Sequence, residues 1–230
     1  MYSYRALAAS VTPRGNLSPR TVIELDSFLS DLKGLRQYSS HGIFFGCGHG
    51  VFEFVPMISS LLAYRLSEDP SALPTSEIYT KYKILDSKLR DWKPAGTDIA
   101  IESATAAIIY QNALLIYLHS FFHPFPTSTS LFSEIEIRTE ICFPLLLSLS
   151  PSRLEGIMLW PAMMIGSRLQ KDEERKMFRQ ACERSAYKMR SLKRGMELLE
   201  FLWGDSDPRA YGPQGLDYVM RKRDLNLCFS

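Results

Sequence analysis

The sequence has no closely spaced cysteines. Its four cysteines stand at positions 47, 142, 182 and 228, whereas a structural zinc site needs close pairs such as C-x2-C. No zinc site is therefore predicted, and single, well-separated cysteines indicate buried thiols in a reducing compartment. The first ten residues also lack a basic stretch followed by an apolar run, so secretion is not expected.

The chain has no strong excess of charge of one sign. Its formal net charge is +2, so no global field attracts nucleic acid or a membrane surface. Basic residues do outnumber acidic ones between Arg168 and Arg223, most visibly at Lys193-Arg194 and at Arg221-Lys222-Arg223. We interpret this stretch as a solvated helical surface. A phosphate-binding or partner-binding surface stays open as the alternative.

No apolar run is free of polar residues over the length of a membrane span. The most apolar stretch, Ile99 to Phe122, is interrupted by Glu102, Gln111, Asn112 and His119. Polar groups of this kind are costly inside a bilayer. The stretch is therefore predicted to be a buried core helix, and no membrane association is expected.

What the sequence does have is helical periodicity. Apolar residues recur at three- and four-residue spacing in segments near 18–32, 51–67, 78–92, 97–122, 131–145, 154–165, 171–190, 192–203 and 216–223. No stretch alternates with period two over a convincing length, and no repeat of fixed length is found. We predict an all-α fold, an irregular array of about eight to nine helices without significant sheet.

The domain organisation is simple. Residues 1–17 contain the turn-forming segment Thr12-Pro13-Arg14-Gly15-Asn16 and are predicted to form a flexible N-terminal arm. Ser18-Pro19 is typical of a helix start, and 18–230 is predicted to be a single helical domain. Proline kinks are expected at Pro144 and Pro161. The helix of 171–190 is predicted to turn Met177, Cys182 and Tyr187 inward.

Catalytic and metal-binding patterns are incomplete. Gly46-Cys47-Gly48-His49-Gly50 lacks the glycine spacing of a dinucleotide-binding turn and the lysine of a phosphate loop, so a turn before a helix is expected. His119 and His123 have the spacing of two zinc ligands, but Ser120 replaces the required glutamate and no third ligand is seen. We interpret both histidines as packed or solvent-tipped residues at a helix end.

Acidic pairs are explained without catalysis. Glu134 and Glu136 could act together, and Asp172 to Glu174 open a predicted helix, where acidic residues are favoured by the helix dipole. No catalytic, cofactor-binding or metal-binding residue is predicted. The methionine- and aromatic-rich segments are first a core, and second a candidate apolar ligand pocket. The candidate pocket residues are Tyr110, His119 and Trp160.

Three segments together resemble the fungal-specific transcription factor domain that follows binuclear zinc clusters. They are Asn112 to Leu118; Leu159-Trp160-Pro161 to Gly166 with Arg175-x-x-Phe178 behind it; and Leu198-Leu199-Glu200-x-x-Trp203 with Gly215 to Met220 behind it. Tyr218 stands where the family often has tryptophan. A weaker match spans Gly46 to Leu62, so that the resemblance covers roughly residues 40 to 225.

The resemblance implies a non-enzymatic regulator of transcription that responds to protein partners or a small-molecule effector, with no cofactor. It implies a nuclear location, or a cytoplasmic one for a stand-alone domain. The six-cysteine cluster of such factors is missing, and no element is recognisable that would present side chains to the major groove. We therefore expect no specific DNA binding by this chain alone. The alternatives are an enzyme on a co-opted regulatory scaffold in fungal secondary metabolism, and a homodimeric scaffold.

Overall fold

The computed structural model describes residue 51 and the ranges 53–68, 74–94, 100–122, 129–150, 154–185 and 190–225. Within them the fold is all-α, as predicted from periodicity, and holds no strand. The helices are α4 (Phe54–Ser67), α5 (Ser76–Asp91), α6 (Ile101–His119), the 3-10 turn η1 (Ser120–Phe122), α7 (Thr129–Ser148), α8 (Glu155–Gly166), α9 (Asp172–Arg184), α10 (Arg190–Trp203) and α11 (Gly212–Lys222). The predicted arm 1–17, the helix from Ser18 and the glycine-rich turn lie outside the described residues.

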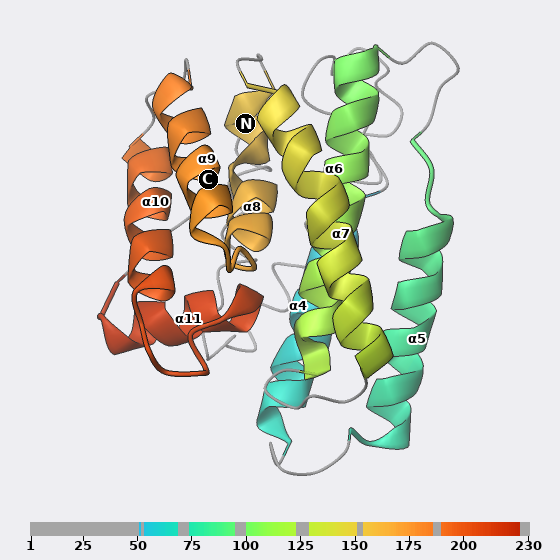
Figure 1. The fold of residues 1–230 in the computed structure, drawn as a ribbon. Coiled ribbons are helices and arrows are strands. Elements are labelled where there is room, and N and C mark those ends of the chain that lie inside the picture. Colours follow the sequence, from blue (N-terminus) through green and yellow to red (C-terminus); the bar gives the residue numbers. More distant parts are fainter. Residues whose placement is uncertain are drawn as a thin grey trace.

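The helices form two groups that meet along α6 and α8 (Figure 1). On the right of the view α4, α5 and α7 pack around α6. On the left α9 and α10 lie beside α8, and α11 crosses below them. Because α6 also packs directly on α8, one continuous apolar core runs through both groups.

Helix α6 is the central element. Nearly every residue from Ala106 to His119 is buried, so this helix has no solvent-facing stripe over its second half. Together with η1 it is long and apolar enough to cross a membrane, but 61% of its most apolar window is covered by the rest of the fold. This is the burial of a core helix.

The predicted helices that fall on described residues match the observed ones closely, with one residue of α9 placed on the wrong face. Met177 was expected to point inward, but half of its surface is exposed, and Phe178 is buried in its place. The face that packs inward carries Phe178, Ala181 and Cys182, which follow helical spacing from the phenylalanine. Tyr187, the third residue predicted to point inward, lies outside the described residues.

Both internal prolines sit within continuous helices, Pro144 in α7 and Pro161 in α8. A proline has no N–H, so Pro161 cannot bond to the carbonyl of Ile157 four residues earlier. The hydroxyl of Tyr110 on α6 donates to this carbonyl. The Tyr110 hydroxyl of α6 thus replaces the N–H that α8 lacks at Pro161. This hydrogen bond fixes the position of α6 along α8.

Replacing Tyr110 by phenylalanine removes that donor and keeps the ring. We expect Tyr110→Phe to lower the free energy of unfolding by about 1–3 kcal/mol, the usual cost of losing the partner of a buried polar group. Urea denaturation followed by circular dichroism measures it. The control is Tyr79→Phe, whose ring is exposed and which we expect to change stability little. Equal effects of the two substitutions would contradict the role given to Tyr110.

Candidate functional site

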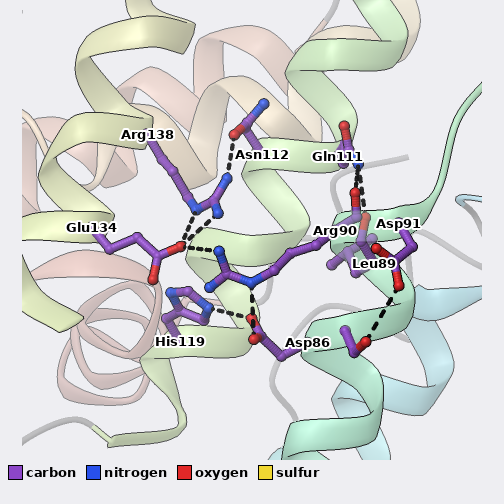
Figure 2. A network of polar contacts seen from close by, with 10 residues as sticks. Asp86, Leu89, Arg90, Asp91, Gln111, Asn112, His119, Glu134 and Arg138 are labelled. Atoms are coloured by element: carbon purple, nitrogen blue, oxygen red, sulfur yellow. Dashed lines mark hydrogen bonds and ion pairs between the residues drawn. The ribbon is translucent and has the colours of Figure 1, made fainter.

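The first candidate is a chain of polar contacts that links α5, α6 and α7 (Figure 2). Asp86 accepts hydrogen bonds from Arg90, one turn further along α5, and lies 2.9 Å from Nε2 of His119 on α6. Arg90 reaches across to Glu134 on α7 at 2.6 Å. His119 and Arg90 therefore contact the same carboxylate, and Arg90 pairs with a second one.

The chain continues from α7 back to α6. Arg138 donates to Glu134, four residues before it on α7, at 2.6 Å and to the amide oxygen of Asn112 at 2.8 Å. Beside it, the amide of Gln111 donates to the carbonyls of Leu89 and Trp92 at the end of α5. Carbonyls at a helix C-terminus have no donor within their own helix, so Gln111 supplies one from α6.

Burial and hydrogen bonding oppose each other at the two acids. Burial alone would raise the pKa of Asp86, but hydrogen bonds from His119 and Arg90 outweigh it and lower the pKa to about 2. Burial would likewise raise the pKa of Glu134, but hydrogen bonds from Arg90 and Arg138 outweigh it and lower the pKa to about 2. Both carboxylates are therefore held ionised, which suits a structural cross-link and not a proton donor near neutral pH.

The second candidate is the Trp203 corner, which we define as Gly166, Arg175, Phe178, Leu199 and Trp203. The indole N–H of Trp203 at the end of α10 donates to the carbonyl of Gly166 at the end of α8, at 3.0 Å. The Phe178 ring meets the indole edge-on with centroids 6.2 Å apart. The guanidinium of Arg175 lies 5.6 Å from the indole centroid, within the range of a cation–π contact.

Gly166 is fixed by close approach in this corner. A Cβ added there would lie 2.9 Å from Cδ1 of Leu199 and 3.2 Å from the Phe178 ring. Arg179 adds a further clamp, because its guanidinium bonds to Glu200 of α10 at 2.9 Å while lying 5.1 Å from the Trp203 centroid. The corner therefore binds α8, α9 and α10 together through residues from three separate sequence segments.

The third candidate is an apolar cavity of about 70 Å³ that lies between α7, α8, α9 and α10 and is partly open to solvent. Its walls include Leu146 of α7, Met158 and Ala162 of α8, Ala181 of α9 and Leu192 of α10. Phe178 and Cys182 of α9 also line it, so the cavity shares Phe178 with the Trp203 corner. Sequence reasoning predicted an apolar, methionine-lined pocket but chose other residues for it.

The three predicted pocket residues are only partly brought together. Tyr110 and Trp160 stack with centroids 6.2 Å apart, and Tyr117 meets the same indole edge-on. His119 lies elsewhere, against Asp86 and the ring of Tyr82. Tyr110 and His119 are nine residues apart, which places them on opposite sides of a helix with 3.6 residues per turn. Ligand binding by these residues stays a prediction.

The histidines, the glycine-rich segment and the acidic pair considered in the sequence do not form a common site in the described residues. His119 is buried and not solvent-tipped, while His123 and the segment from Gly46 to Gly50 lie outside the described residues. Glu136 is exposed, so the carboxylate that pairs with basic residues is Glu134. Among the described residues no three His, Cys, Asp or Glu side chains are grouped to hold a metal ion.

The residues that gather at the Trp203 corner are those on which the family resemblance rests. A family model described as fungal specific transcription factor domain matches residues 2–230. The chain belongs to this family. No curated protein and no solved structure matches the sequence.

In this fungal-specific transcription factor domain the family segments are explained by packing. Trp160 stacks on Tyr110 and Pro161 frees the carbonyl that Tyr110 binds, while Gly166, Arg175 and Phe178 meet at Trp203. Tyr218, which stands where tryptophan is frequent, donates through its hydroxyl to Asp207 at 2.8 Å. The segments therefore identify the scaffold.

The ion-paired chain went unrecognised in the sequence, although a signal was present. Asp86 with Arg90, and Glu134 with Arg138, are acid–base pairs at i,i+4 with the acid first, the arrangement that favours pairing on a helix. Asn112 and His119 are seven residues apart and so share one side of α6. Only the packing of the three helices shows that the pairs face one another.

The close fit at Gly166 predicts a strong response to one methyl group. We expect Gly166→Ala to lower the free energy of unfolding by about 1–3 kcal/mol, as overpacking of a filled interior does. Gly195→Ala is the control, because its new Cβ also lies 2.9 Å from a side chain, but that atom is the sulfur of the unbranched Met163 and the next contact is at 3.6 Å. Urea midpoints compare the two, and a Gly166→Ala protein as stable as Gly195→Ala would refute the close-packed corner.

The lowered pKa values of Asp86 and Glu134 predict acid sensitivity. Below the ordinary values of 3.8 and 4.5, the unfolded chain takes up protons that the folded chain refuses until about pH 2. We therefore expect the stability from both carboxylates to be complete above about pH 5 and to fall between pH 4.5 and 2. Urea midpoints measured at several pH values follow this loss.

The matched pair for this experiment lies on one helix. Asp86→Asn removes a carboxylate of the chain, whereas Asp91→Asn removes an exposed one on the last turn of α5. We expect Asp86→Asn to be less stable at neutral pH and to lose less stability on acidification. If both variants follow the wild-type pH profile, the paired carboxylates do not set the acid response.

Proposed function

We propose that this domain regulates transcription in the nucleus without itself reading DNA sequence or catalysing a reaction. The observation that carries the proposal is the family match over residues 2–230, joined to the packing of the family segments at the Trp203 corner. What the fold offers to the outside is then its helical surfaces and its apolar cavity, which suit protein partners or an effector molecule.

The pairing of basic with acidic side chains argues against strong binding to nucleic acid. Many cations of the basic stretch between Arg168 and Arg223 have acidic partners. Arg179 pairs with Glu200, and Lys222 pairs with Asp205 at 2.7 Å. DNA binding depends on lysines and arginines that neutralise phosphates and so release counterions. A lysine or arginine that already pairs with a carboxylate must break that ion pair first, which weakens its binding to phosphate.

The expected regulatory activity can be measured by fusion. The chain is joined to an unrelated sequence-specific DNA-binding module, and a reporter gene with sites for that module is assayed in fungal cells. We expect reporter transcription to change at least severalfold relative to the module alone, because the domain recruits or withholds partners. Unchanged transcription with a stably expressed fusion would contradict a regulatory role.

The absence of DNA reading is tested on the purified chain. We expect mobility-shift titrations at physiological salt to show weak binding without sequence preference, since non-specific contacts alone give dissociation constants of about 10⁻⁴–10⁻⁶ M. A selected oligonucleotide bound much more tightly than a scrambled one would refute this part of the proposal. The control is the fusion protein, which must select the site of its added module.

A further inference from the structure

We infer that the cavity between α7, α8, α9 and α10 is a binding site for the apolar end of a small uncharged molecule. This inference deepens the proposed function, because it supplies the chemical class of an effector. Its first support is position. The cavity lies between four helices that belong to both groups of the fold and is partly open to solvent, with Leu146 on one wall and Met158, Ala181 and Leu192 on the others.

The chemistry of the walls selects an uncharged ligand. Among the described residues, no acidic or basic side chain lines the cavity, and the polar side chains that do so are Ser150, Ser185 and Cys182. An ionised group placed there would lose part of its hydration without gaining an opposite charge from these walls, which disfavours its binding. A neutral, largely apolar molecule meets no such penalty.

The size of the cavity limits what enters. A water-sized group occupies about 10–15 Å³ on this measure, so 70 Å³ accepts roughly five heavy atoms. That is a short branched alkyl group, either as a whole molecule or as the end of a longer one. Met158 extends the range, because an unbranched thioether side chain adapts to irregular shapes.

Two alanines keep the space open. Ala162 on α8 and Ala181 on α9 present only methyl groups to the cavity, so a larger side chain at either position would occupy the volume. Phe178 forms another wall and also meets the indole of Trp203. A ligand in the cavity therefore lies one side chain away from the corner that joins α8, α9 and α10.

The probes are isopentyl alcohol and two charged analogues of the same shape, isovalerate and isopentylamine. Saturation-transfer NMR on the purified chain measures binding without any transcriptional readout. We expect the alcohol to bind and both ions to bind at least tenfold more weakly. Equal binding of the three molecules, or no binding of the alcohol up to its solubility limit, overturns the inference.

The location is tested with a matched pair on α9. Ala181→Leu fills the cavity, and Gln180→Leu places the same side chain on the exposed neighbouring position. We expect alcohol binding to fall at least tenfold in Ala181→Leu and to persist in Gln180→Leu. Ala162→Val is the second filling variant if Ala181→Leu does not fold by circular dichroism. Binding that survives filling overturns the assignment.

A covalent readout gives the same location independently. Cys182 lines the cavity, while Cys142 is buried and burial raises its pKa to about 12, which leaves it a poor nucleophile. We expect isopentyl alcohol to slow methylthiolation of Cys182 severalfold, as read by peptide mass spectrometry. No protection in a protein that binds the alcohol places the ligand elsewhere. Because these measurements need no reporter gene, they can fail while the fusion experiment succeeds, and the reverse.

Discussion

The structure depends on a helix that is buried on nearly all sides and yet carries polar groups. An apolar helix without a solvent face has little in its hydrophobic pattern to fix its rotation or its register. In α6 this is done by polar side chains, each of which meets a different neighbour. Tyr110 binds the backbone of α8, Gln111 the end of α5, Asn112 the arginine of α7, and His119 the aspartate of α5. Leaving any of them unpaired in the core is costly, so the satisfied arrangement is strongly favoured over its alternatives.

The need to pair buried polar groups also fixes how α6 joins the second group of helices. Pro161 would weaken α8 if the Ile157 carbonyl it frees had no donor, and Tyr110 supplies one from outside the helix. Gly166, the last residue of α8, then accepts a hydrogen bond from Trp203 through its carbonyl, and Leu199 packs where a Gly166 side chain would lie. The family segments therefore depend on one another. Pro161 leaves a carbonyl that needs the Tyr110 hydroxyl as its donor, and the missing side chain of Gly166 makes room for Leu199.

Periodicity was sufficient for the helices because each buried face repeats at the spacing of the helix, and this local signal survives without knowledge of the partner. It could not choose among neighbouring apolar residues, so Met177 was placed inward where Phe178 is buried. His119 lies apart from Tyr110 and Trp160 for a reason already visible in the sequence, since nine residues separate Tyr110 from His119 by two and a half turns. The i,i+4 pairs of Asp86 with Arg90 and of Glu134 with Arg138 are local patterns. The cavity walls and the contact between these pairs depend on helices distant in sequence, and no local pattern encodes those contacts.

The two groups of helices share one apolar core, and the cavity lies where they meet. Around α6, ion pairs among Asp86, Arg90 and Glu134 add a link between α5 and α7. Around α8, the added contacts are centred on Trp203. The cavity has Leu146 of α7 on one side and Phe178 of α9 on the other, so a molecule within it touches an element of each group. Because packed interiors respond to small changes in volume, filling this cavity would change the packing where the two groups are joined.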